Sequence, residues 1–331
     1  MKKERFGLED FVNDFGYFHT KMDKLFLKEL LVKAAKDDKP HYNKKLIIQL
    51  GMKFTKNRDH CKTIYGWTTY EKTIPLNKLA KIIKLSRVSW KEVESNIFSI
   101  KAGQKKGEIK PNFPIKINKN LGTIVGHILG DGAIDKKYQQ ISFSNSDKFL
   151  LHEFKDHMRE IFSIKPRIWM QKSPDFGNTK WDKRLNNIDE LEYGRNCGLF
   201  YPSICGLLLN SIFDNFAVGK NKRITKKILA ANSEFKKGLI RAFFDDEATV
   251  DIKSRYIRIF QDRVDILEDF RTLLKEFNII PREIKCYIKG DKKRYYFNIS
   301  KEENLKLFRK KIGFTSPKKE SKLDLIITHQ A

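Results

Sequence analysis

The spacing of hydrophobic residues along the chain alternates between two periods, and each period predicts a different secondary structure. In segments 150–161 and 266–277, apolar side chains recur three and four positions apart, which predicts amphipathic helices. Alternation of apolar and polar residues predicts strands at 141–143, 256–259, 283–288 and 294–299. Gly290 and Asp291 separate the last two runs, and such a pair is typical of a hairpin turn.

The same order of elements occurs twice. Residues 122–168 align without a gap on residues 238–284, at a shift of 116 positions. Identical or similar residues coincide at this shift: Gly122 with Gly238, Ile124 with Ile240, Gly126 with Ala242, Asp131 with Glu247, Asp135 with Asp251, Ile141 with Ile257, Leu151 with Leu267, Phe154 with Phe270, Ile164 with Ile280, and Ile168 with Ile284. Each copy reads α-β-β-α-β-β-α. A period this long indicates two tandem copies of one small domain, related by a pseudo-twofold axis.

The part of the chain before the repeats reads differently. Residues 1–40 carry a helical apolar pattern, and residues 41–100 read as short helices joined by tight turns. The second segment ends in Arg87-Val88-Ser89-Trp90 and resembles helix-turn-helix DNA-binding domains of the lambda-repressor style. A generic small helical domain fits the same pattern. Residues 101–117 are rich in lysine, with Glu108 as the one acid, and are expected to be a solvated basic linker that could lie along phosphates.

The charge of the chain indicates the kind of partner. Lys and Arg number 67 against 41 Asp and Glu, a net charge of +26. Such a surplus predicts a polyanionic partner, and nucleic acid is the first candidate. The codon bias of an AT-rich genome is the alternative explanation, but it does not account for the shortage of acids.

The spacing of the cysteines and the hydropathy of the chain indicate the cellular compartment of the protein. None of the four cysteines is spaced as a zinc or redox motif, so we expect free thiols: Cys61, Cys197, Cys205 and Cys286. No long uncharged apolar run could span a membrane, so no membrane association is expected. A soluble protein of a prokaryotic cytoplasm, associated with the nucleoid, is the resulting prediction.

Each copy opens with a predicted helix that contains small residues four positions apart and ends in a carboxylate. The first helix runs Ile124-Val125-Gly126-His127-Ile128-Leu129-Gly130-Asp131-Gly132, and the second runs Ile240-Arg241-Ala242-Phe243-Phe244-Asp245-Asp246-Glu247-Ala248. The small residues predict that the two helices pack closely across the pseudo-twofold axis. Their C-terminal ends would then bring Asp131 and Glu247 side by side. Carboxylates are hard oxygen ligands that suit Mg²⁺.

These two segments resemble the paired motifs of the LAGLIDADG homing endonucleases, and the resemblance covers roughly residues 118–315. It implies an α+β fold in which two α-β-β-α-β-β-α repeats, 118–218 and 219–331, form a DNA-binding saddle behind a small all-α domain. It also implies metal-dependent hydrolysis of double-stranded DNA with Mg²⁺, or another divalent cation such as Mn²⁺. Under this resemblance Asp131 and Glu247 are catalytic metal ligands, and Gly130 and Asp246 are further metal-site positions.

The resemblance extends to lysines and to the sheet surface. The family places a lysine near the scissile phosphate, and the segment 219–225 makes Lys220 or Lys222 the candidate, with a surface role as the alternative. Strand residues are expected to read the major groove, and the candidates are Arg255, Arg258, Lys285, Tyr287, Lys289, Arg294 and Tyr296. Which of them face DNA depends on strand register, which the sequence does not fix. A chain with both repeats is expected to act as a monomer on a long, non-palindromic site.

One residue departs from the motif, and alternatives to an endonuclease stay open. Ala248 stands where the family has glycine, and since alanine tolerates left-handed backbone poorly, the second turn is expected to be altered. A catalytically inactive DNA-binding transcriptional regulator and an intron maturase are the alternative functions. A glycosidase-type carboxylate pair is disfavoured by the net charge. The chain lacks an initial Cys or Ser and a final His-Asn, so a free-standing protein is expected rather than a self-splicing intein.

Overall fold

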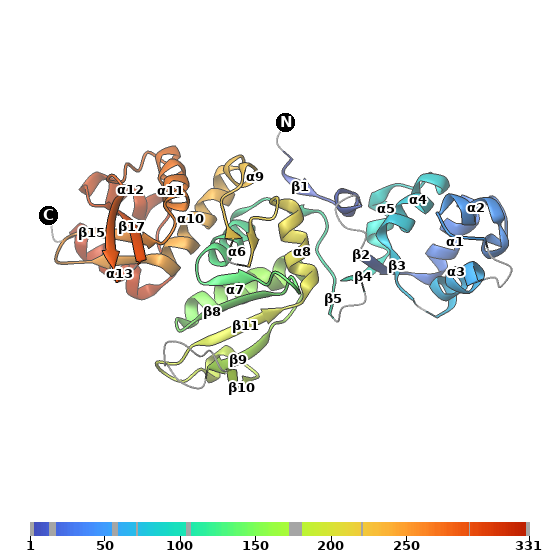
Figure 1. Cartoon of the computed structure of the whole chain (residues 1–331), viewed down its shortest axis with the longest axis horizontal. Coiled ribbons are helices and arrows are strands. Elements are labelled where there is room, and N and C mark those ends of the chain that lie inside the picture. The colour runs from blue at the N-terminus through green and yellow to red at the C-terminus, as the bar shows by residue number, and fades with distance from the viewer. Residues whose placement is uncertain are drawn as a thin grey trace.

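The computed structural model describes residues 3–12, 18–54, 59–70, 72–103, 107–171, 181–219, 221–290 and 292–328. Its elements form three units that follow one another in space as they do in sequence (Figure 1). We call them the N-terminal unit (3–117), repeat one (118–218) and repeat two (219–328). No helix within these described ranges is long and apolar enough to cross a membrane.

The N-terminal unit combines short helices with a sheet. The helices are η1 (Leu8–Phe11), α1 (Lys24–Ala35), η2 (Pro40–Tyr42), α2 (Lys44–Gln49), α3 (Asp59–Thr69), α4 (Leu76–Ser86) and α5 (Trp90–Ser95). The strands are β2 (Phe18–Met22), β3 (Ile74–Pro75), β4 (Ile97–Ala102) and β5 (Glu108–Ile109), in the order β3-β2-β4-β5. The expectation of an all-α unit is therefore wrong. The strand β2 alternates buried and half-buried residues, but the run is only five residues long and leads directly into α1.

The segment expected to be a solvated linker is partly built into sheets. The end of β4 and all of β5 lie within it, and β6 (Ile115–Lys116) pairs with β1 (Arg5–Phe6). Ile109 and Ile115 are buried. Two isolated isoleucines among lysines form no periodic pattern, so the sequence did not predict a strand here. They are buried because their strands pair with distant residues.

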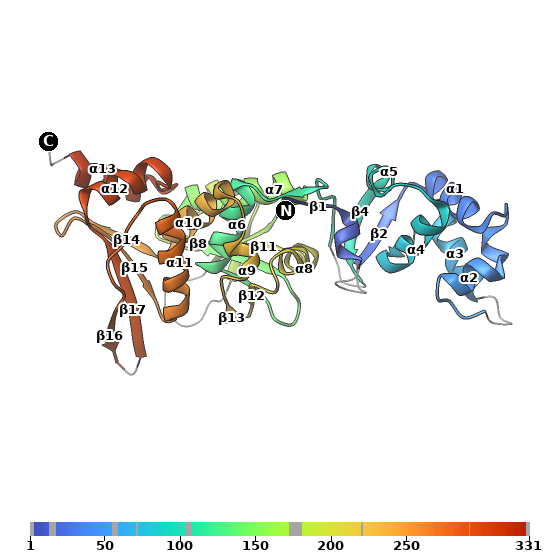
Figure 2. The ribbon, with the colours of Figure 1, turned by 90° about the horizontal axis from the view of Figure 1, so that it is seen from above.

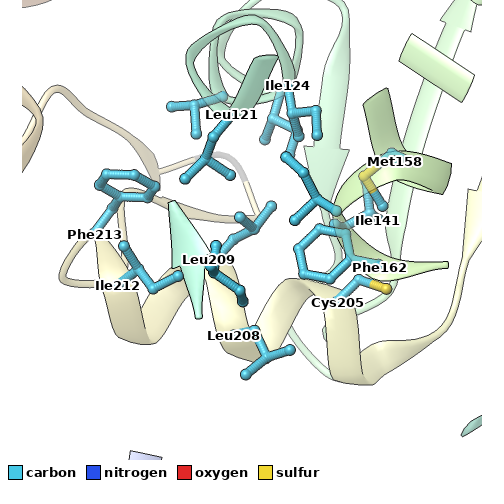
Figure 3. Packing of buried hydrophobic residues seen from close by; sticks show 14 of the residues in the cluster. Leu121, Ile124, Ile141, Met158, Phe162, Cys205, Leu208, Leu209, Ile212 and Phe213 are labelled. Carbon is cyan, nitrogen blue, oxygen red and sulfur yellow. The ribbon is translucent and has the colours of Figure 1, made fainter. Parts of the chain in front are cut away.

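Repeat one is an α+β unit. Its elements are α6 (Lys119–Leu129), β7 (Gly132–Ile134), β8 (Ile141–Asn145), α7 (Lys148–Phe162), β9 (Arg167–Gln171), β10 (Trp181–Leu185), η3 (Ile188–Glu190), β11 (Cys197–Tyr201), α8 (Ser203–Ile212) and β12 (Ala217–Val218). Five of its strands form an antiparallel sheet in the order β10-β9-β11-β8-β7. Figure 3 shows the core between the helices and β8, where Ile124, Ile141, Met158 and Phe162 converge.

Repeat two has the same plan with a smaller sheet. Its elements are β13 (Asn221–Lys222), α9 (Lys226–Leu229), α10 (Ser233–Glu247), β14 (Ala248–Asp251), β15 (Tyr256–Gln261), α11 (Val264–Glu276), β16 (Lys285–Lys289), β17 (Lys292–Ile299), α12 (Glu302–Lys311) and α13 (Pro317–Thr328). The strand order is β14-β15-β17-β16, and all pairs are antiparallel. In Figure 2 the β16–β17 hairpin projects beyond the rest of this unit.

The duplication and the α+β fold class are confirmed. Adding 116 to the start of β7 and of α7 gives the start of β14 and of α11. The correspondence ends after β9, because repeat one inserts β10 before the central strand β11, whereas β17 follows β16 directly. The predicted order α-β-β-α-β-β-α therefore describes repeat two through α12, and repeat one departs from it by one strand.

The two repeats meet through α6 and α10, which lie side by side in Figures 1 and 2. A Cβ atom on Gly122 would lie 2.0 Å from the carbonyl oxygen of Phe235, and one on Gly238 would lie 2.1 Å from that of Lys119. A Cβ atom on Gly126 would lie 2.8 Å from that of Ala242. Any side chain at the two most crowded positions would overlap backbone of the partner helix. The small residues therefore allow backbone-to-backbone contact, as the sequence predicted.

This contact gives the first testable prediction. Alanine in place of glycine normally stabilises a helix by up to about 1 kcal/mol. The Gly122→Ala substitution should instead destabilise the protein, because the new methyl group overlaps the α10 backbone. We expect a loss of about 1–3 kcal/mol or more in the free energy of unfolding. Denaturant unfolding measures the change. The matched control is Gly66→Ala in α3, where only the flexible side chain of Lys72 lies close; an equal loss in both variants would contradict the prediction.

Candidate active site at the ends of the paired helices

The helix pair brings Asp131 and Glu247 to one place. Asp131 follows the end of α6, and Glu247 is the last residue of α10. Asp131 is exposed at the surface of the site, yet desolvation by the surrounding protein and the negative charges of Asp246 and Glu247 raise its pKa to about 7. Burial and the charge of Asp246 also raise the pKa of Glu247 to about 7, against the opposing effect of Lys222. The two carboxyl groups thus share a confined space in which neither ionises easily.

This arrangement fits a divalent cation. Asn145 donates a hydrogen bond of 3.0 Å to Asp131 Oδ2 and orients that carboxylate. No group of three or more His, Cys, Asp or Glu side chains within the described ranges forms a ready metal cage. Mg²⁺ is usually held by one or two carboxylates, with water and substrate phosphates completing its shell. An open pair of carboxylates is therefore a suitable donor set for Mg²⁺ bound together with a phosphate.

The structure places Asp246 and Gly130 differently from what the sequence led us to expect. The Asp246 side chain is buried in the helix interface, where His127 Nδ1 lies 3.1 Å from both of its oxygens and the Asp131 amide donates to it at 3.3 Å. The carbonyl oxygen of Gly130 accepts a hydrogen bond from Lys222. Both groups already have protein partners. They border the carboxylate pair, and a metal-binding role for either of them stays a prediction.

Two lysines flank the carboxylates, and only one was anticipated. Lys222 binds the end of α6, while Lys319 on α13 donates to the carbonyl of Asp245 at the end of α10. Burial lowers the pKa of both lysines, and the nearby carboxylates oppose that effect. Lys319 carried no signal in the sequence, because the residue that corresponds to it at the shift of 116 is Ser203 (319 − 116 = 203) and not a lysine. Lys220 lies outside the described residues.

His127 is the centre of a buried charge network that joins the two repeats. Its side chain is fully buried. Its Nε2 lies 3.6 Å from Glu153 Oε2, and Glu153 is also bound by Arg241 and by Thr315 of repeat two. Burial alone would lower the pKa of His127, but the charges and hydrogen bonds of Asp246 and Glu153 outweigh burial and raise the pKa to about 10. The imidazole is therefore a cation at neutral pH.

The register of the repeat-two sheet resolves which candidate DNA contacts share a face. Thr249 pairs with Arg258, Arg258 with Asn298, and Phe260 with Tyr296, while the intervening Ile257 and Ile259 are buried against helices. The candidates whose register positions fall on the exposed face are Arg258, Lys285, Tyr287, Lys289, Arg294 and Tyr296; only the backbone of Lys289 is described. Arg255 is the exception, since it lies in the β14–β15 turn and donates to the Ile326 carbonyl at 3.3 Å.

Repeat one has an equivalent face that the sequence reasoning missed. The pairing of β8, β11, β9 and β10 places six exposed or half-buried residues on one face of the sheet. They are Ser142, Ser144, Arg167, Trp169, Arg184 and Phe200. Trp181 packs edge-on against Phe200, with ring centres 5.2 Å apart. The alternation in Arg167-Ile168-Trp169-Met170 was a readable strand signal. Both faces therefore combine aromatic residues with arginine.

Alanine at position 248, where the family has glycine, does not alter the turn as we expected. Ala248 has φ −92° and ψ 151°, which is ordinary extended backbone at the start of β14. Gly132, its counterpart, is not left-handed either. Glycine is required at 132 for another reason, since a Cβ there would lie 2.8 Å from the His127 carbonyl oxygen. The second turn is therefore not strained by alanine.

A family model matches within repeat two. Residues 234–313, from the first turn of α10 to just beyond α12, match the LAGLIDADG-like domain. The matched segment contains Glu247 and the whole repeat-two sheet. Repeat one lies outside the match, and its elements from α6 to α7 follow those of the matched segment, from α10 to α11, at the shift of 116.

Similar sequences occur within proteins of different names. One is the DNA-directed RNA polymerase subunit Rpo1C of Methanocaldococcus jannaschii, 26% identical over 261 residues, which are 78% of this chain and 26% of that protein. The replication factor C small subunit of the same organism is 28% identical over 63% of this chain and 10% of its own length. Its probable translation initiation factor IF-2 is 34% identical, over 66% and 17%. The chain spans 10–26% of the length of these relatives.

Solved structures show weaker likeness. The homing endonuclease I-DmoI in complex with DNA and Mn is 14% identical, with 60% of this chain and 97% of that chain covered and a TM-score of 0.39. The homing endonuclease I-WcaI bound to its DNA recognition sequence is 15% identical over 62% and 87%, with a TM-score of 0.40. The N-terminal LAGLIDADG domain of DUF199/WhiA is 17% identical over 61% and 85%, with a TM-score of 0.39. TM-scores below 0.5 add no argument to those above.

The His127 network gives the second prediction. In His127→Leu, Asp246 and Glu153 lose their shared cation in a buried place, and we expect a loss of about 3–5 kcal/mol in the free energy of unfolding. The double variant His127→Leu/Asp246→Ala should recover much of that loss. His152→Leu is the control: its partner Asp189 is exposed, so the expected cost is below about 1 kcal/mol.

The same network sets a pH dependence with a defined sign. The pKa of His127 is raised on folding, so its stabilising contribution is complete below about pH 6.5 and is lost as pH rises toward 10. The difference in unfolding free energy between the wild type and the double variant should therefore shrink over this range. A difference that stays constant from pH 6.5 to 10 would show that the folded protein does not hold His127 as a cation.

Proposed function

We propose that the protein is a site-specific, divalent-metal-dependent endonuclease of double-stranded DNA. The observation that carries the proposal is the pair Asp131 and Glu247, held together at the ends of two helices in backbone contact, each with its pKa raised to about 7. Two carboxylates that resist joint ionisation gain from a bound cation, which removes their repulsion. The net charge of +26 supports a polyanionic substrate.

The residues around the pair have distinct roles in this proposal. Asp131 and Glu247 would hold the metal, which supplies activation of water and stabilisation of the leaving oxygen. Lys222 and Lys319 place positive charge beside the carboxylates, where a scissile phosphate would bind. The exposed faces of the two sheets would hold the DNA on both sides of the helix ends.

The comparisons favour a mobile element over a fixed cellular role. A polymerase subunit, a replication factor and an initiation factor have different names, yet each matches this chain over only 10–26% of its length. The shared segment is therefore not what those names describe. A segment that occurs within several different proteins has the distribution expected of a genetic element that inserts itself into genes. Cleavage of the target DNA is a reaction that such insertion requires.

The carboxylate pair supplies the third prediction. Asp131→Asn and Glu247→Gln should each lower the cleavage rate by roughly three orders of magnitude, because a metal ligand is lost. Binding should change little, because the sheet faces are unaltered. Cleavage with Mg²⁺, and binding in Ca²⁺, would be measured on a duplex selected by the wild type from a randomised library.

Glu303→Gln on α12 is the matched control, since Glu303 is exposed and pairs only with Lys301 among the described residues. It should cleave at the wild-type rate. Full cleavage by either carboxylate variant would refute the site. A wild type that binds one sequence tightly and never cleaves it, with Mg²⁺ or Mn²⁺, would favour the alternative of a DNA-binding regulator.

The stoichiometry of the DNA complex is the fourth prediction. One chain already contains both helices of the pair, so we expect a complex of one protein and one duplex. The two sheet faces carry different residues, so the bound site should lack twofold symmetry. Analytical ultracentrifugation with the selected duplex measures the ratio. A two-to-one complex on a palindrome would mean that the helix pair of a single chain does not form the site.

A further inference from the structure

Arg258 is held on the exposed face of the repeat-two sheet in an unusual way. Its guanidinium carbon lies 4.2 Å from the ring centre of Tyr256 and 4.6 Å from that of Tyr296. Its Nε donates a hydrogen bond of 2.8 Å to Asn298 Oδ1. The ring faces attract the cation, and the amide fixes the direction of the guanidinium plane. Arg258 is thus restrained before any ligand arrives.

Three other arginines of repeat two have anionic or carbonyl partners. Arg294 lies 3.3 Å from Asp262, Arg263 is bound to Asp265, and Arg255 donates to a backbone carbonyl. Within the described residues, no carboxylate forms an ion pair with Arg258, and no hydrogen bond occupies its two terminal nitrogens. The Tyr256 hydroxyl instead binds Asp251, at 3.3 Å. Arg258 therefore presents an oriented pair of donors without a counter-ion.

Two parallel N–H donors match one base edge. In the major groove guanine presents two acceptors, O6 and N7, whereas adenine pairs an acceptor with a donor and cytosine presents a donor. Resting on the function proposed above, we propose that Arg258 determines specificity by binding a guanine through its two terminal nitrogens. The restraint by Tyr256, Tyr296 and Asn298 lowers the entropy that an arginine loses on binding.

The sheet also fixes where this guanine lies in the target. Arg258 pairs with Thr249, two residues after Glu247. Two steps of about 3.3 Å along β14 and one strand spacing of about 4.8 Å put the Arg258 backbone roughly 8 Å from that of Glu247. At about 3.4 Å per base pair, the guanine should lie roughly two to four base pairs from the cleaved bond. The β16–β17 hairpin extends further out and would reach distal base pairs (Figure 2).

The test compares the base preferences of variants. Randomised duplex DNA would be selected for binding in Ca²⁺ by the full-length wild type, by Arg258→Gln and by Arg258→Lys. The wild type should prefer guanine at one position near the cleaved bond, by roughly tenfold to hundredfold. Both variants should lose that preference and keep the others, because lysine retains the charge but not the planar pair of donors.

Arg294→Gln is the matched control. Arg294 shares the exposed face but is paired with Asp262, so its loss should leave the guanine preference intact. Thermal unfolding of each variant checks that the sheet is folded. If Arg258→Gln folds and keeps the guanine preference, the inference is overturned while the proposed function stands. If the wild type selects no sequence at all, the proposed function itself fails.

Discussion

Backbone contact between α6 and α10 is the constraint on which the rest of the site depends. Gly122 and Gly238 let the two helices touch without intervening side chains, so their C-terminal ends converge. Each end contributes partial negative charge from its carbonyl groups, and Asp131, Asp246 and Glu247 add theirs. So much negative charge in a small volume must be balanced. Lys222 and Lys319 at the helix ends, and His127 within the interface, supply that balance.

The symmetry of the helix pair is broken at its centre by one position. Gly130 and Asp246 correspond at the shift of 116, and a Cβ on Gly130 would lie 2.5 Å from Asp246 Oδ2. The two copies cannot both carry a side chain there. Glycine in one helix makes room for the carboxylate of the other, and His127 and the Asp131 amide then fix that carboxylate. Asp246 thereby links the buried network to the backbone of a proposed metal ligand.

The sequence was informative wherever a local period or the duplication applied. The motif helices, their small residues and the two carboxylates repeat at one shift, and the structure has them in register. Lys319 lies in a part of repeat two that does not align with repeat one, so the shift of 116 positions does not identify it. The N-terminal sheet was missed because β3 and β5 are two residues long and show no alternation. Arg255 reads as a strand residue, yet its φ of 53° places it in a turn. These outcomes depend on tertiary contacts that a one-dimensional pattern does not contain.

The two repeats diverge in a way that follows from packing. At the helix pair almost any added atom meets backbone, so both copies keep glycine or alanine. On the exposed sheet faces, substitutions away from buried partners change stability by only about 0.5 kcal/mol or less. Those faces are free to differ, and repeat one carries Ser142 and Trp169 where repeat two carries Arg258 and Lys285. A single chain with a closely packed helix pair and unlike sheet faces can therefore bring two carboxylates together while contacting two different sequences.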